Sequence, residues 1–178
     1  LQFIDDPVPL DPDVEKGLRG LIPMVQKIRN RPSMTDSGDR LYGLETEALC
    51  RLHLPGYEER KEAIRLLNIA QVQEQQNQHV SGAHVLYNNL IQGHYYAKHW
   101  AELLEEIDKY KRFVKAKGEF NPLITKIIDF NEMIGKLMLR EIDITPKEIE
   151  QRSKELFKQY PKWYNDLAAY SIKHLKLD

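Results

Sequence analysis

The sequence has few of the features that mark secreted, membrane-spanning or strongly basic proteins. It contains one cysteine, Cys50, so no disulfide can form within the chain. No apolar run approaches the roughly 20 residues needed to cross a bilayer, and no signal segment opens the chain. The net charge of −1 excludes a globally basic nucleic-acid binder, so any basic site must be local. We therefore expect a cytoplasmic protein with no membrane contact.

Glycine and proline are scarce in the second part of the chain. Residues 1–56 hold five of the nine glycines and six of the nine prolines, whereas residues 57–178 hold four and three. This difference predicts an N-terminal region of irregular segments and short helices over 1–56 and a helical domain over 57–178. Asp11 and Pro12 are typical of a helix start, and Pro23 is expected to kink or divide that first helix.

Apolar residues of the second part recur at helical spacing, and no segment alternates with period two for long enough to form a strand. Asn121-Pro122 and Thr145-Pro146 are start signals for helices, and Ser81-Gly82 is expected to separate two of them. The fold predicted is all-α: a multi-helix bundle or array with a long central helix and helical hairpins. The helices expected before and after these starts cover residues 57–78, 83–116 and about 162–176.

The central helix over 83–116 carries an apolar seam with heptad spacing. At about 1.5 Å per residue this helix would span roughly 50 Å, which is long for a small domain. Either Gly93 breaks it or part of it packs on another chain, so packing within the chain and a homo-oligomer interface both stay open. The seam residues, which would hold helices together, are Leu86, Leu90, Gly93, Ala97, Trp100 and Leu104.

Motifs for catalysis are absent from the sequence. It has no Gly-x-Ser-x-Gly, no glycine-rich phosphate loop and no dinucleotide fingerprint. His94 and His99 are separated by about 140° on a helix, so they are not expected to bind one metal ion together. Cys50 lies among leucines and is interpreted as a small core residue rather than a nucleophile. We predict a protein that is not an enzyme and has no metal or other cofactor.

Local positive charge supplies the candidate binding site. Residues 109–117 contain five cations and no anion, interleaved with Tyr110 and Phe113. Such cations can follow the phosphates of duplex DNA, although cations at a helix C-terminus also complement the macrodipole. Arg29 and Arg31 could likewise meet a phosphate, but solvated loop arginines are the interpretation we favour there. The five predicted DNA contacts are Lys109, Lys111, Arg112, Lys115 and Lys117.

The order of motifs after this helix matches a known pattern. A helix with scattered aromatics leads to Lys115-Ala116-Lys117-Gly118, then to Asn121-Pro122, and after a further helix to Ile142-Asp143-Ile144-Thr145-Pro146. In this respect residues 80–152 resemble the phage terminase small-subunit family, with Asp143 where that family usually has glycine. The resemblance implies a ring-forming, non-catalytic homo-oligomer that recognises viral DNA for packaging and engages a large ATPase subunit.

A second interpretation comes from the same residues. The run from Leu90 to Leu104 also resembles a helix-turn-helix unit of tetratricopeptide type, with a break near Lys98-His99. The chain would then be a helical-repeat scaffold for a protein or peptide partner. No second copy follows at the ~34-residue period of that repeat, so we rank this alternative below the DNA-packaging subunit.

Overall fold

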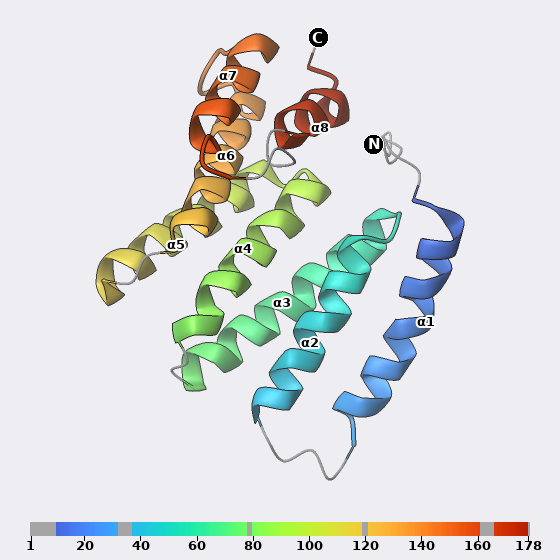
Figure 1. The fold of residues 1–178 in the computed structure, drawn as a ribbon. Helices are drawn as coiled ribbons and strands as arrows, with labels where there is room; N and C mark the ends of the chain where they lie inside the picture. Colours follow the sequence, from blue (N-terminus) through green and yellow to red (C-terminus); the bar gives the residue numbers. More distant parts are fainter. Residues whose placement is uncertain (1–9, 32–36, 78–79, 119–120, 161–165, 178) are drawn as a thin grey trace. The chain divides into compact units, whose positions relative to one another are not determined.

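The structure is a computed structural model that describes residues 10–31, 37–77, 80–118, 121–160 and 166–177. Within these ranges the chain forms eight helices and no strand, which confirms the predicted all-α, multi-helix fold (Figure 1). None of the described helices has both the length and the apolar character needed to span a bilayer. The helices are α1 (Pro12–Arg29), α2 (Ser37–Leu52), α3 (Tyr57–Asn77), α4 (Val80–Ala97), α5 (Trp100–Lys117), α6 (Pro122–Met138), α7 (Pro146–Leu156) and α8 (Asp166–Leu175).

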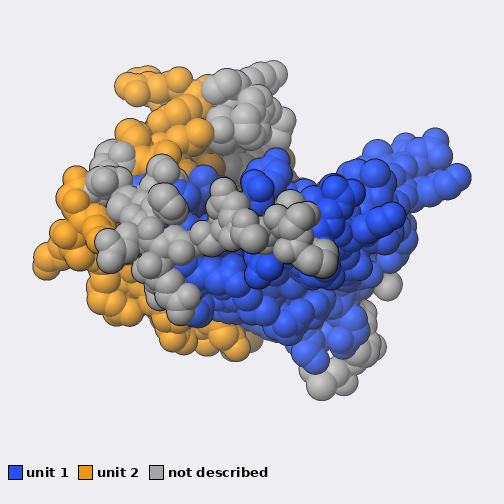
Figure 2. Space-filling view, turned by 90° about the horizontal axis from the view of Figure 1, so that it is seen from below, with its two compact units in different colours: residues 1–3, 9–99 blue, residues 4–8, 100–178 orange. Residues whose placement is uncertain are grey.

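The chain divides into two compact units, which Figure 2 shows in different colours. Among the described residues, unit 1 runs to His99 and contains α1 to α4, and unit 2 runs from Trp100 and contains α5 to α8. The sequence had led us to expect the boundary between residues 56 and 57. Pro55 and Gly56 lie in the turn between α2 and α3, with Gly56 at φ +104°, and these two helices pack extensively against each other. The turn therefore joins two helices of one unit.

The predicted central helix over 83–116 is two helices. α4 ends at Ala97, and the turn is closed by backbone hydrogen bonds from Lys98 N–H to Tyr95 O (3.1 Å) and from His99 N–H to His94 O (2.9 Å). Lys98 has φ +58°, the left-handed conformation of a Schellman motif. A break at Gly93, one of the alternatives left open, is therefore wrong, and the break lies near Lys98-His99, where the tetratricopeptide-like interpretation placed it.

The first helices also differ from expectation at two places. We expected Pro23 to kink or divide the first helix, and the structure shows that it does not divide it, since α1 includes Pro23 as one helix. Pro23 is exposed, so water can hydrate the carbonyl that lacks its helical hydrogen bond, and the helix continues. Ser81-Gly82 does not separate two helices but lies in the first turn of α4.

Three predicted helix starts are confirmed. The carboxylate of Asp11 accepts a hydrogen bond from the Asp13 amide at 2.8 Å, and the Asn121 side chain accepts from the Ile124 amide at 3.1 Å. At α7, Thr145 forms a capping box with the side chain of the third helical residue, which accepts from the Thr145 amide at 2.7 Å. These local bonds satisfy amides that the helix itself leaves free, which explains why α1, α6 and α7 begin there.

The core of unit 1 joins α2, α3 and α4. Ala48, Ala63 and Ala70 are completely buried, and their small side chains allow the helix backbones to approach closely. Ile22 of α1 covers a second cluster, which contains Cys50. The remaining buried members of the main cluster are larger: Leu44, Leu52, Ile64, Leu66, Leu67, Leu86 and Leu90.

Unit 2 is built on the hairpin of α5 and α6. Gly135 of α6 lies against α5 so closely that a Cβ atom there would stand 2.9 Å from Leu103 Cδ2 and 3.0 Å from Leu104 Cδ2. α7 packs on α6 through an aromatic pair, Phe157 with Phe130, whose ring centroids are 6.3 Å apart. Aliphatic side chains of the same helices are buried as well, among them Leu103, Ile107 and Ile134, so the core of this unit combines aliphatic and aromatic packing.

Ser153 of α7 provides a test of packing in unit 2. Its side chain is completely buried, and its Oγ atom has no hydrogen-bond partner among the described residues. A buried hydroxyl without a partner costs about 1–3 kcal/mol, and alanine has the higher helix propensity. We expect Ser153→Ala to raise the free energy of unfolding by about 1 kcal/mol, measured by urea denaturation. A loss of stability would contradict the packing described here.

Candidate functional site

The structure divides the five predicted DNA contacts into two groups, all on the C-terminal half of α5. Lys109 and Lys111 are held in ion pairs. Lys109 Nζ lies 3.1 Å from Glu105 and 2.6 Å from Glu106, and Lys111 Nζ lies 2.6 Å from Glu132 on α6. Two of the five cations therefore already neutralise carboxylates of their own chain and are less available to a ligand.

The other three cations form what we call the basic end of α5: Arg112, Lys115 and Lys117. All three are exposed, and none forms an ion pair with a described residue. Asp108 lies one turn before Arg112 and is the acid on α5 that shares this side of the helix. Lys115 follows Arg112 by one turn, whereas Lys117 lies about 140° around the helix from Arg112, so the carboxylate of Asp108 is near only part of the basic end of α5.

A shallow hollow of about 180 Å³ lies between α5 and α6, beside the basic end of α5. Tyr110 and Thr125 meet in it, with their hydroxyl oxygens 3.3 Å apart, and Lys115 lines its rim. Asp129 lines it as well, and burial raises the pKa of its carboxyl, an effect that Lys111 opposes. Because Asp129 places a carboxyl group inside the hollow, a phosphate is better accommodated by the exposed cations outside it.

The six seam residues do not form one stripe, since the turn at Lys98 separates them. Leu86, Leu90, Gly93 and Ala97 lie on α4 in unit 1, and Trp100 and Leu104 on α5 in unit 2. Leu86 and Leu90 are 1% and 0% exposed within the core of unit 1. A Cβ atom on Gly93 would lie 3.0 Å from Ile64 Cγ1. These three positions face other helices of the same unit.

The turn at Lys98 also brings His94 and His99 together. Their ring centroids are 5.9 Å apart, and His99 Nε2 lies 3.2 Å from the hydroxyl of Tyr57. The separation that we expected from a continuous helix is therefore wrong. Within the described residues, no group of three or more histidine, cysteine or acidic side chains is arranged to hold a metal ion.

Cys50 is buried at 6% exposure with Ile22 and Leu54. Burial raises the pKa of its thiol, and the neighbouring Glu47 carboxylate adds to this effect. Since the thiolate is the nucleophilic form, this environment favours the unreactive, protonated thiol.

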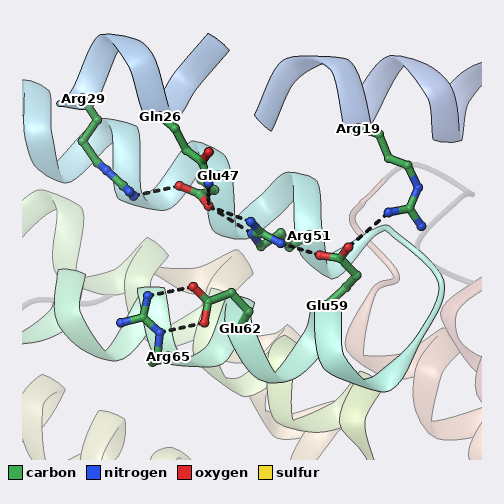
Figure 3. Close-up of polar contacts among 8 residues, drawn as sticks. All are labelled: Arg19, Gln26, Arg29, Glu47, Arg51, Glu59, Glu62 and Arg65. Carbon is green, nitrogen blue, oxygen red and sulfur yellow. Dashed lines mark hydrogen bonds and ion pairs between the residues drawn. The ribbon is translucent and has the colours of Figure 1, made fainter. Parts of the chain in front are cut away.

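Sequence analysis missed a network of buried polar contacts in unit 1 (Figure 3). The Glu47 carboxylate of α2 is 1% exposed and accepts hydrogen bonds from Gln26 Nε2 (2.7 Å), Arg29 Nη1 (2.8 Å) and Arg51 Nε (3.0 Å). Arg51 also bonds Glu59 of α3 at 2.5 Å. The network ties α1, α2 and α3 together, and the four-residue spacing of Glu47 and Arg51 was its one signal in the sequence.

A second feature of unit 1 is a hollow of about 460 Å³, which we call the arginine hollow. It contains Arg29 and Arg31, the pair for which a phosphate contact was considered from sequence. The structure adds Arg40 from the first turn of α2 and Arg65 from α3. The sequence gave no sign that Arg40 and Arg65 would join this pair, because they come from two other segments of the chain.

Comparisons of the chain with models of protein families, with curated proteins and with solved structures found no match. Any functional assignment therefore depends on the sites themselves. Two surfaces dominated by cations are candidates: the basic end of α5 in unit 2 and the arginine hollow in unit 1.

Proposed function

We propose that this protein is a non-enzymatic DNA-recognition and assembly subunit, similar in role to phage terminase small subunits. The observation that carries the proposal is the basic end of α5, where Arg112, Lys115 and Lys117 are exposed and form no ion pair with a described residue. Exposed lysine and arginine bind DNA by neutralising phosphates and releasing counterions. The resemblance of residues 80–152 to the terminase family supports the same role.

The number of phosphate contacts follows from the ion pairs of α5 and α6. Burial opposes ionisation of Glu132, but hydrogen bonds from Lys111 and Lys136 outweigh it and lower the pKa of this carboxyl. Glu132 therefore stays charged at neutral pH and holds Lys111 in place. We infer about three phosphate contacts for each subunit rather than five. Each contact contributes about −0.9 to the slope of log K against log salt concentration.

Three contacts are few for stable DNA binding by one subunit. In a ring of identical subunits the basic end of α5 would be repeated, and the modest affinity of each copy would add to that of the others. We therefore propose a homo-oligomer that works in the cytoplasm and hands DNA to a large ATPase subunit. Light scattering tests this part directly, because a mass of several chains supports it and a monomer contradicts it.

The DNA contact is tested with the triple variant Arg112→Gln, Lys115→Gln, Lys117→Gln. We expect its affinity for duplex DNA to fall at least tenfold at low salt, and the slope of log K against log salt to flatten by about 2.7. Fluorescence anisotropy with labelled duplex DNA, repeated at several salt concentrations, measures both quantities.

The matched control removes three exposed lysines elsewhere in unit 2: Lys147→Gln, Lys154→Gln, Lys158→Gln. It changes the net charge by the same amount and is expected to leave the salt slope nearly unchanged. If both variants lose affinity equally, binding depends on net charge and the basic end of α5 is not the site. If the unmodified protein does not bind duplex DNA at low salt, the proposed function is wrong.

A helical scaffold for a protein partner is the second candidate. It is supported by the turn at Lys98-His99, where the tetratricopeptide-like interpretation places its break, and by the packing of α1 on α2, α2 on α3 and α3 on α4 in sequence order. A monomer without affinity for duplex DNA would favour this function over the first.

A further inference from the structure

α1 has apolar residues on two faces, and one of them is exposed. Leu18 and Ile22 belong to the covered face, which packs with Cys50 of α2. Figure 1 shows α1 at the edge of unit 1, beside α2. The side chains of the second face that are large and apolar are 45% to 60% exposed. We call this second face the open face of α1, and its residues are Val14, Gly17, Leu21, Met24 and Ile28.

The open face of α1 is both concentrated and regular. It holds four of the eleven large apolar residues that are exposed within the described parts of the chain. Its positions are separated by three, four, three and four residues, which is the heptad spacing of helices that pack side by side. An apolar surface of this kind on a helix is typical of a contact with another helix.

Two glycines in the interior of α1 support a contact from outside the chain. Glycine destabilises a helix interior relative to alanine. At Gly93 and Gly135 a Cβ atom would lie 3.0 Å and 2.9 Å from side chains of neighbouring helices, so close packing within the unit explains glycine there. At Gly17 and Gly20 a Cβ atom would meet no described atom within 4 Å. A second helix that approaches α1 closely would explain these two glycines.

The charges at the two ends of α1 indicate what covers the open face. The first turn of α1 is acidic and its last turn is basic. Asp13 and Lys27 border the open face at opposite ends, are exposed, and form no ion pair with a described residue. In an antiparallel pair of identical helices, Asp13 of each copy lies beside Lys27 of the other, and the two helix dipoles are opposed. A parallel pair would place like charges together.

We propose that the open face of α1 binds the same face of a second copy of this chain in an antiparallel, two-fold symmetric helix pair. In the register that brings Asp13 beside Lys27, Gly17 of each copy faces Leu21 of the other. Each leucine then lies on bare backbone, so the helices approach closely and bury apolar surface. The inference rests on the homo-oligomer of the proposed function, to which it adds one contact between subunits.

The mass in solution tests the pair. We expect Leu21→Glu, Met24→Glu to raise the dissociation constant about a hundredfold, because each copy would bring two unpaired charges into the contact. Light scattering at about 100 μM should then show half the number of chains found for the unmodified protein. The matched control is Val72→Glu, Val85→Glu, two apolar residues of unit 1 with similar exposure. An unchanged mass in the first variant, or the same loss in both, would overturn the proposal.

A second variant separates loss of pairing from loss of folding. Gly17→Gln, Gly20→Gln introduces better helix formers at positions where the described chain leaves space for a side chain. We expect helix content to be retained, measured by circular dichroism, and self-association to weaken about tenfold, because the new side chains hold the two helices apart. Unchanged self-association would contradict the close approach at these glycines and with it the proposed pair.

Cross-linking tests the orientation of the two helices. A disulfide forms where two Cα atoms lie within about 7 Å, and the native Cys50 is buried. Because position 17 faces position 21 of the other copy, a mixture of the Gly17→Cys chain and the Leu21→Cys chain should cross-link on oxidation, whereas either chain alone should not. In a parallel pair position 17 faces position 17, so cross-linking of the Gly17→Cys chain alone would overturn the antiparallel arrangement.

Duplex DNA distinguishes failure of the pair from failure of the proposed function. A dimer that Leu21→Glu, Met24→Glu converts to a monomer, but that has no affinity for duplex DNA at low salt, would support the pair and contradict the function. Binding of DNA by an oligomer whose mass the variant leaves unchanged would support the function and overturn the pair. A monomeric unmodified protein at about 100 μM would overturn the pair, and its affinity for DNA would then test the function separately.

Discussion

Replacing Glu47 by glutamine is expected to lower the free energy of unfolding by about 3 kcal/mol. The carboxylate is 1% exposed, and its two arginine partners, Arg29 and Arg51, are 19% and 17% exposed. Glutamine has nearly the same shape but carries no charge, and its amide nitrogen would face guanidinium donors. Arg29 would then lose its carboxylate and Arg51 would keep only Glu59, and removing one partner is the costly way to break a buried ion pair. Urea denaturation of the full chain measures the loss.

The control for this prediction is Glu62→Gln in the same unit. Glu62 pairs with Arg65, whose side chain is 59% exposed. Hydrogen bonds from Arg65 lower the pKa of the Glu62 carboxyl. Water can replace the lost contact at this exposed site, so we expect a cost below about 1 kcal/mol. Equal costs at Glu47 and Glu62 would mean that burial does not determine the strength of the network.

The sequence was enough to predict the features of the fold that depend on residues close together in the chain. The starts of α1, α6 and α7 follow from Asp11, Asn121 and Thr145, because a capping side chain bonds amides two or three residues away. The end of α4 was expected only in the tetratricopeptide-like alternative, which placed a break near Lys98-His99, whereas the preferred interpretation continued the helix to residue 116. The left-handed residue of this turn is Lys98, and glycine is the usual signal for that conformation, so the local sequence gave no strong stop signal.

The remaining differences between the predicted and the observed candidate sites come from contacts between residues that are far apart in the chain. The cations of α5 are visible in sequence, but the partner of Lys111 is Glu132, on the following helix. A sequence pattern cannot reveal that pair, so it overestimates the number of free cations. The arginine hollow is a stronger case, since Arg29 and Arg65 are brought together by the packing of α1 and α3 on α2.

The largest effect in unit 2 is expected from Phe157→Ala. Phe157 is 1% exposed at the C-terminal end of α7, and its ring centroid lies 6.3 Å from that of Phe130 and 6.4 Å from that of Tyr160. Alanine would leave a cavity among these rings and remove the aromatic pairs, at a cost of about 4 kcal/mol. Urea denaturation measures the total, and hydrogen exchange by mass spectrometry shows where protection is lost.

We expect the loss of protection in Phe157→Ala to concentrate in α6 and α7, since Phe130 and Phe157 join these helices. The Glu47→Gln variant should lose protection mainly in α1 to α3, which its network connects. Leu139→Ala is the control for unit 2, because Leu139 is 40% exposed and its truncation should cost less than about 1 kcal/mol. If Phe157→Ala left α6 and α7 protected, the aromatic cluster would not be what stabilises unit 2.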